Sequence, residues 1–350
     1  MVSSSKPAHV DTESRTLATQ IIGWNPRRVV LLTCTLLFVL LGMVFGMYYS
    51  LVGDNPMIMG SQGVVTFDPH LRTDIVLALV TAYTFGAGLT GSAKATREFG
   101  RLRHILRLDD QSFDRYRSRL VPDKRALWIA APIGGFIGAS LSLLPLFDSS
   151  FQPSQWSWHS FPFMILLFGL LGMMAMITHR QSQVFREVGR RHIDVDLLDP
   201  DAFSPFAAVG LLNAGLWLIG SAIASLLMAS GANIWIVIVV IIATTGIGVA
   251  GLIVPSRGLH THILARKREE LAEIRNAIVN ERASLFSESD RSSVLPRMSD
   301  MLAYEARIES VREWPFDTST LGRFALFLLI PLVSWIGGAL VERIVDSALG

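Results

Sequence analysis

Seven stretches of the chain are almost wholly apolar, and each is about as long as a membrane-crossing helix. A helix rises about 1.5 Å per residue, so roughly 20 apolar residues cross the hydrocarbon core of a bilayer. None of the stretches contains Asp, Glu, Lys or Arg. The pattern predicts an all-α, polytopic membrane protein with about seven transmembrane helices. The predicted spans are Val29–Val52, Ile75–Ala93, Ala126–Phe147, Phe161–Thr178, Pro205–Met228, Asn233–Pro255 and Phe324–Val341.

The polar segments divide the chain into four parts. Residues 1–25 are polar and aperiodic, which predicts disorder. Residues 26–255 hold spans one to six with their connecting loops, and residues 318–350 hold the seventh span and a short tail. Residues 256–317 are predicted to form a helical hairpin outside the membrane.

The hairpin segment carries an imperfect coiled-coil pattern. Apolar residues recur every seven positions in its first half, with Ile274 between them, but Lys267 and Glu281 occupy other seam positions. A second helix follows the polar stretch Ser287–Ser293. Either the two helices pack on each other, or residues 264–285 dock a second copy of the chain or a cytoplasmic protein. The apolar positions are Leu264, Leu271, Ile278 and Leu285, then Leu295, Met298, Leu302, Ile308 and Val311.

The positive charge of the chain predicts its orientation. The chain is 51% hydrophobic and 17% charged, and its net charge of +2 hides an uneven distribution. Segments rich in Lys and Arg resist translocation. With the N-terminus inside, only Arg72 and Arg343 of the 31 basic residues lie outside. The sequence therefore predicts a protein of the bacterial inner membrane, with a cytoplasmic N-terminus and an external C-terminus.

The segment 94–125 is rich in Arg and has apolar residues spaced for one face of two short helices. We expect it to lie on the membrane surface, where its Arg side chains would contact anionic lipid. Interleaved acidic residues argue against nucleic acid as a partner. The apolar residues are Leu102, Ile105, Leu106, Phe113, Tyr116 and Leu120.

Spans two to seven are predicted to form three tandem helix pairs that follow one anchor helix. Spans two and six share a glycine spacing, and residues 97–101 are similar to residues 186–190. Several residues of the stretch Asp199–Gly220 also have an identical residue in the stretch Asp317–Gly338, always at the same offset along the chain. Three units of one orientation would be related by an axis along the membrane normal. The shared glycines are Gly86, Gly88 and Gly91, and Gly246, Gly248 and Gly251.

These glycines and Asn213 are the candidate site residues. Lipid tails are as apolar as Leu, so membrane helices associate largely through small residues that let their backbones touch. Asn213 could add an interhelical hydrogen bond, worth roughly 0.6–2 kcal/mol. The same half-spans could line a polar path, or their hydroxyls bond back to their own helices. The hydroxyls concerned are those of Thr81, Tyr83, Thr84, Thr244 and Thr245. Further glycines four residues apart are Gly42 and Gly46, and Gly134 and Gly138.

Signals for catalysis are weak. Both glycine triplets match G-x-G-x-x-G, but a dinucleotide site needs a preceding strand and an open helix N-terminus, and these triplets lie inside predicted spans. The histidines have no thiol or carboxylate partner at ligand spacing. Cys34, the one cysteine, lies mid-span, where a buried, small hydrophobic role is expected. No cofactor, metal or catalytic residue is predicted, and the chain is not expected to be an enzyme.

The long hairpin and the absence of catalytic clusters favour a non-catalytic scaffold, assembly or signalling component that uses its cytoplasmic helices. The alternative is a channel or facilitator-type transporter with a path lined by the Gly/Thr-rich half-spans. No span buries an ionisable residue, which counts against proton-coupled transport.

Overall fold

The part of the chain that the structure describes is helical apart from one small β-hairpin and the turns and loops between its elements. Strands β1 (Met57–Met59) and β2 (Val65–Phe67) pair antiparallel, with Met57 opposite Phe67. The predicted disorder of residues 1–25 falls outside the described part of the chain. The computed structural model describes residues 26–52, 57–59, 65–67, 69–144, 160–230, 234–284, 291–331 and 333.

Six helices in these ranges are long and apolar enough to cross a membrane. They coincide with the first six predicted spans, so the chain has the architecture of a polytopic α-helical membrane protein. A shorter apolar helix, Thr318–Pro331, stands where the seventh span is predicted, and the rest of that span lies outside the described residues. The six are α2 (Pro26–Val52), α3 (Pro69–Arg101), α5 (Lys124–Leu143), α6 (Ser160–Arg191), α7 (Ser204–Ser225) and α8 (Ile234–Ser284).

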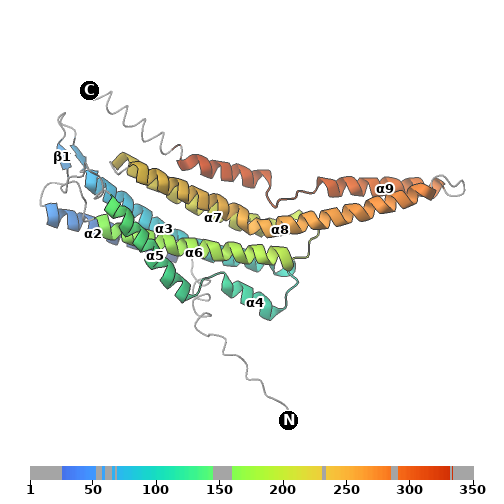
Figure 1. Ribbon diagram of the computed structural model, residues 1–350, viewed down its shortest axis with the longest axis horizontal. Helices are drawn as coiled ribbons and strands as arrows, with labels where there is room; N and C mark the ends of the chain where they lie inside the picture. The colour runs from blue at the N-terminus through green and yellow to red at the C-terminus, as the bar shows by residue number, and fades with distance from the viewer. Residues whose placement is uncertain are drawn as a thin grey trace, which may run out of the picture.

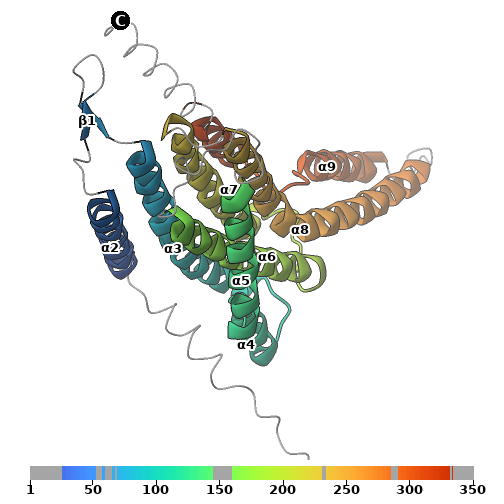
Figure 2. The same cartoon turned by 60° about the vertical axis from the view of Figure 1, so that its left-hand side comes forward.

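Helices α3, α6, α7 and α8 form the centre of the bundle. Helix α6 packs against α3, α5 and α8, while α7 packs against α3 and α8. Helix α2 packs along α3 at the edge of the bundle (Figure 2). The most extensive helix contacts join α5 with α6 and α7 with α8, whereas α6 and α7, a pair in the predicted repeat, touch only slightly.

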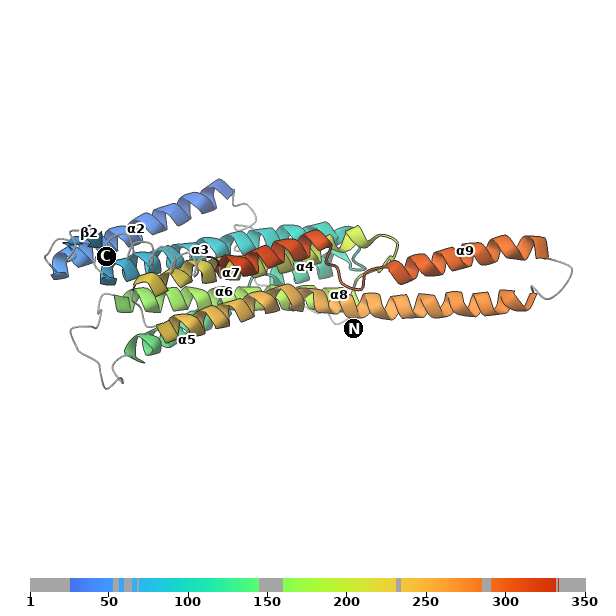
Figure 3. The same ribbon diagram turned by 90° about the horizontal axis from the view of Figure 1, so that it is seen from above.

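Three helices continue well past their apolar stretches at one end of the bundle, seen at the right in Figure 1. We call this part, formed by residues 94–125, 179–204 and 256–320, the basic end. Helix α8 reaches farthest and carries α9 (Arg291–Ser310) folded back beside it (Figure 3). The shorter elements here are the 3₁₀ turns η1 (Leu102–His104) and η4 (Pro200–Phe203) and helix α4 (Asp110–Arg119). A further 3₁₀ turn, η5 (Leu226–Ser230), follows α7 at the opposite end.

An apolar protein core fills the basic end, and it overturns one expectation. Leu102, Phe113 and Leu120 are buried in this core and do not face the membrane surface. The Phe113 ring stacks on Phe99 of α3, with ring centroids 5.2 Å apart. Because α3 and α6 project beyond their apolar stretches, they give the apolar face of α4 a protein partner, and Phe185 of α6 lies in the same core.

Two loops of the basic end lie side by side. The backbone N–H of Arg107 donates to the carbonyl of His192 at 2.8 Å, and that of Asp194 donates to the carbonyl of Ile105 at 3.0 Å. These bonds flank an antiparallel bridge between Leu106 and Ile193. The segments that follow the similar stretches 97–101 and 186–190 are therefore joined directly.

The expectation for Cys34 is wrong, because its side chain is exposed. Helix α2 contacts the bundle along one side only, through Leu40, Val44 and Tyr48, which are buried. Cys34 lies away from that side, so this thiol is not a core residue of the chain.

Candidate functional site

The two glycines at the ends of the first triplet meet different helices. A Cβ added to Gly86 would lie 2.5 Å from Thr33 Oγ1 of α2, and one added to Gly91 would lie 2.9 Å from Leu216 Cδ1 of α7. Both are tighter than an ordinary contact, so a side chain at either position would push neighbouring atoms away. These glycines let α3 approach α2 and α7.

In the second triplet, Gly248 and Gly251 both face α7. A Cβ added to Gly248 would lie 3.3 Å from Leu218 Cγ, and one added to Gly251 would lie 3.2 Å from the Cβ of Asn213. Asn213 is therefore brought against the second triplet. The first triplet contacts α7 through Leu216 instead.

A Cβ added to Gly88 or to Gly246 would have no neighbouring atom within 4 Å among the residues that the structure describes. The same is true of Gly42 and Gly46 in α2. Gly86 and Gly246, which correspond in the predicted repeat, therefore have unlike surroundings. Glycine spacing alone does not identify which positions are helix contacts in this chain.

Asn213 is buried, with 2% of its surface exposed, but its amide Nδ2 finds no hydrogen-bond partner within the described ranges. The same holds for Nε2 of buried Gln181 in α6. One helical turn away, Trp217 Nε1 of α7 donates to Thr178 Oγ1 of α6 at 3.2 Å. Because α6 and α7 are antiparallel, both unpartnered amides lie on the basic-end side of that bond. The interhelical hydrogen bond predicted for Asn213 is not formed.

The centre of the bundle is filled by side chains. Ala87, Met174 and Trp217 form a buried cluster with Leu171 packed against it. Tyr83 packs against the same cluster, and its hydroxyl donates across the bundle to the Leu216 carbonyl at 2.8 Å. Helices α3, α6 and α7 therefore meet here through packed side chains.

The hydroxyls of Thr81, Thr84 and Thr244 donate to carbonyls of their own helices, at 2.6, 2.8 and 2.8 Å. The prediction that these hydroxyls bond back to their own helix is confirmed for these three residues, whereas the Tyr83 hydroxyl bonds to α7 instead.

Helices α5 and α6 approach each other very closely. A Cβ at Gly134 would lie 2.1 Å from the Phe168 carbonyl oxygen, and one at Gly138 would lie 2.5 Å from the Met164 carbonyl oxygen. The four-residue spacing of Gly134 and Gly138 predicted such a contact, and here the prediction is confirmed. The partner atoms are backbone, so they cannot swing away as a flexible side chain would.

A comparable approach joins α6 and α8 at the basic end. A Cβ at Gly258 would lie 2.0 Å from the Arg186 carbonyl oxygen, and one at Gly189 would lie 3.0 Å from the Leu259 nitrogen. Gly189 lies in the predicted repeat 186–190 but was not expected to be a helix contact, and Gly258 belongs to no repeated spacing. Their position brings two arginine-bearing stretches together.

A pocket of about 750 Å³ lies at this approach of α6 and α8. Its one acidic residue, Glu187, already accepts from Tyr116 OH at 3.1 Å and from Arg119 at 3.3 Å. On another wall, the His260 ring stacks on Trp314 with centroids 4.2 Å apart. The lining residues are Gln183, Arg186, Glu187, Arg190, Arg191, Arg257, Gly258, His260, Thr261 and Trp314.

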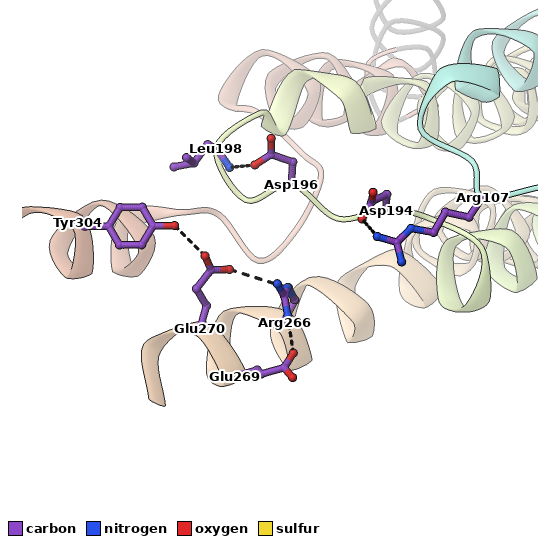
Figure 4. A network of polar contacts seen from close by, with 8 residues as sticks. All are labelled: Arg107, Asp194, Asp196, Leu198, Arg266, Glu269, Glu270 and Tyr304. Carbon is purple, nitrogen blue, oxygen red and sulfur yellow. Dashed lines mark hydrogen bonds and ion pairs between the residues drawn. The ribbon is translucent and has the colours of Figure 1, made fainter. Parts of the chain in front are cut away.

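A network of ion pairs lies beside a neighbouring pocket of about 410 Å³, whose lining also includes Arg191 of the first pocket (Figure 4). Arg107 pairs with Asp194 across the two joined loops. Arg266 pairs with Glu269 at 2.8 Å and lies 3.9 Å from Glu270. Each guanidinium of this network therefore has a carboxylate partner.

The hairpin of α8 and α9 is held by polar contacts at its base. Lys267 Nζ donates to the carbonyls of Glu309 at 2.8 Å and Val311 at 2.9 Å, and the residue is only 9% exposed. These carbonyls lie at the C-terminal end of α9, where helices leave acceptors unpaired and favour positive charge. Lys267, which interrupts the predicted seam, therefore caps the partner helix.

A second polar contact lies farther along the hairpin. Tyr304 OH donates to Glu270 at 2.7 Å, and this hydrogen bond, more than burial, raises the pKa of Tyr304. Arg275, on the exposed side, reaches Glu305 and Glu309, at 2.7 Å each.

The apolar contacts of the hairpin differ partly from those expected. Leu271, Ile274 and Ile278 of α8 belong to the apolar core of the basic end. In α9, Ile308 is buried as predicted, but Leu302 is 51% exposed and Tyr304 faces the core in its place. The seven-residue spacing therefore predicted the core-facing positions of α8 better than those of α9. Leu285 and Leu295 fall among positions whose side chains are not described.

Comparison with known proteins gives no relative: no family model, curated protein or solved structure matches the chain. Within the described ranges, no group of three or more His, Cys, Asp and Glu side chains is placed to hold a metal ion. The arrangement of the chain's own residues is therefore the basis for any functional conclusion.

Proposed function

We propose that the protein is a non-catalytic scaffold, assembly or signalling component of a bacterial inner membrane. The basic end would lie in the cytoplasm, because segments rich in Lys and Arg resist translocation. One observation carries the proposal: α8 runs without interruption from Ile234 to Ser284, from an apolar span into the hairpin. At about 1.5 Å per residue, such a helix is roughly 75 Å long.

The hairpin has the features of a fixed, protruding arm. Lys267 joins α8 to the end of α9, and Ile274 and Ile308 contribute to the core beneath it. Farther out, Val279 and Leu302 are 64% and 51% exposed. An arm with a supported base and exposed apolar side chains suits contact with a cytoplasmic protein or a second copy of the chain.

The channel alternative has less support. It draws on the glycine triplets, yet four of these six glycines lie against neighbouring helices. Trp217 and Met174 occupy the centre of the bundle.

The test is a chain whose arm is shortened. Residues 279–300 are replaced by a short Gly-Ser turn, which keeps the contacts of Lys267, Glu270 and Arg275. A photo-crosslinker at Val279 in the full-length chain, with one at exposed Phe38 of α2 as control, reports partners in cells.

The proposal predicts that the shortened chain inserts normally but behaves like a deletion of the whole gene, and that Val279 gives a discrete crosslink. If the shortened chain supports growth as the full chain does, and Val279 crosslinks no protein, the proposed role is wrong. Solute flux through reconstituted protein that survives the shortening would favour the channel alternative.

A further inference from the structure

We propose that the pocket between the C-terminal end of α6 and the middle of α8 binds a phosphate-bearing anion, as found in the headgroup of an anionic lipid. This binding site does not depend on the proposed arm. The residues that would hold the phosphate are Arg186, Arg190, Arg191 and Arg257.

The charge of this pocket is uncompensated. None of its four arginines forms an ion pair with any residue that the structure describes, and the one carboxylate in the lining, Glu187, is already bound by Tyr116 and Arg119. Elsewhere at the basic end, arginines such as Arg107 and Arg275 have carboxylate partners. Guanidinium groups bind phosphate through paired, charge-assisted hydrogen bonds, so an anion would supply the missing counter-charge.

The backbone places the arginines around one space. Gly258 sits against the carbonyl of Arg186, so Arg257 is carried to the same level of the bundle as Arg186. Arg190 follows Arg186 by one helical turn and therefore lies on the same side of α6. Arginines from two helices thus surround a single pocket, which an isolated basic helix could not provide.

Two estimates of the depth of the pocket bracket the lipid headgroup region. Arg186 follows Thr178, the end of an apolar stretch, by eight residues, or about 12 Å of helix. Arg257 follows Pro255 by two residues, or about 3 Å. Headgroup regions occupy roughly the first 5–8 Å beyond the hydrocarbon core. Basic pockets between helices at this depth suit anionic headgroups.

An aromatic wall completes the pocket. His260 stacks on Trp314, and its Nδ1 lies 2.9 Å from the carbonyl oxygen of Glu313, which fixes the orientation of the ring. Indole rings favour the boundary between hydrocarbon and water. The wall therefore has the amphipathic character expected beside a lipid headgroup.

The test measures lipid retained by the purified full-length chain, using native mass spectrometry after equilibration with phosphatidylglycerol or phosphatidylcholine. The double variant Arg186→Gln/Arg257→Gln removes two charges from exposed positions of the pocket. The control Arg97→Gln/Arg101→Gln removes two charges from α3, where Arg101 pairs with Glu98. Thermal unfolding midpoints show whether each variant is folded.

We expect phosphatidylglycerol to be preferred, the pocket variant to lose about tenfold or more in affinity, and the control to change little. Glycerol 3-phosphate and inorganic pyrophosphate are added as competitors. Competition by either would identify the source of the phosphate as a free compound, and no competition would identify it as the lipid. Equal loss in both variants, or equal retention of the two lipids, would overturn the proposal, because binding would then reflect general surface charge.

Discussion

The α5–α6 and α8–α9 pairs are both antiparallel helix hairpins, yet they are held together by different contacts. In the first, Gly134 and Gly138 bring one backbone against the carbonyls of the other. In the second, Lys267 caps the partner helix and Arg275 reaches two glutamates, while an apolar stripe fills the seam.

The difference follows from the surrounding solvent. Lipid offers no gain for burying Leu between helices, so close backbone contact has to supply the attraction. Water does reward the burial of apolar side chains, and Ile274 and Ile308 are buried where α8 and α9 meet the core of the basic end. Helix α8 makes both kinds of contact: Gly251 packs closely on α7, and the apolar side chain of Ile274 lies in the core of the basic end.

The largest expected effect is on the glycine contact. The double variant Gly134→Ala/Gly138→Ala should lose about 1–3 kcal/mol of stability per site, because each new Cβ meets a backbone oxygen. The control Gly42→Ala/Gly46→Ala has the same spacing but no neighbour within 4 Å, and should be unchanged or slightly stabilised. Thermal or denaturant unfolding in detergent measures both. Equal losses would mean that α2 also packs through glycine, against a second copy.

The next largest effect is on the capping lysine. Lys267→Met keeps the apolar stem but leaves the carbonyls of Glu309 and Val311 without their donor, which should cost about 1.5–3 kcal/mol. Hydrogen exchange should accelerate at the end of α9 and stay unchanged in α5. Arg268→Met, at the exposed neighbouring position, is the matched control. Similar exchange in the two variants would contradict the capping role.

A smaller effect is expected at Asp317, which precedes the apolar helix 318–331. Hydrogen bonds from Ser319 and Thr320 hold the pKa of the Asp317 carboxyl well below its usual range. A lowered pKa means that the cap stabilises the helix above about pH 4 and is lost only as pH falls through the lower folded value. Asp317→Ala should therefore weaken the hydrogen-exchange protection of the first residues of the helix 318–331, by the same amount at every pH from 5 to 8. Asp317→Asn should retain it, and failure to do so would exclude capping.

The smallest effect is expected for the exposed ion pairs. Arg275→Ala removes contacts with Glu305 and Glu309. The side chains of Arg275 and Glu309 are more than half exposed, so water and salt screen their charges, whereas Glu305 is 17% exposed. The loss should be well below that of Lys267→Met and should disappear in about 1 M salt. Unfolding midpoints at low and high salt measure it. A large, salt-independent loss would show that Arg275 packs as part of the seam.

The sequence predicted the spans better than the contacts between them. Apolar length is a one-dimensional property, so the first six spans appear directly in the chain. Which glycine touches a neighbour depends on helix rotation, and Gly88 and Gly258 could not be distinguished by spacing. Lys267 looked like a flaw in the seam because its acceptors lie more than 40 residues away.

The basic end was the least predictable part. The segment 94–125 has the pattern of surface helices, and no local signal showed that α3 and α6 would project far enough to bury Phe113. The arginine pocket was hidden for the same reason. Arg186 and Arg257 stand in separate stretches, and only the approach at Gly258 joins them.

The continuity of α8 has a mechanical consequence. No loop separates its bilayer part from the 27 residues beyond Arg257, which extend about 40 Å. A change of only about five degrees in the tilt of the span would move the far end by roughly 3.5 Å if the helix turns as one rod. Lipid thickness, pressure on the bilayer or contact among neighbouring spans would thereby be converted into displacement at the tip.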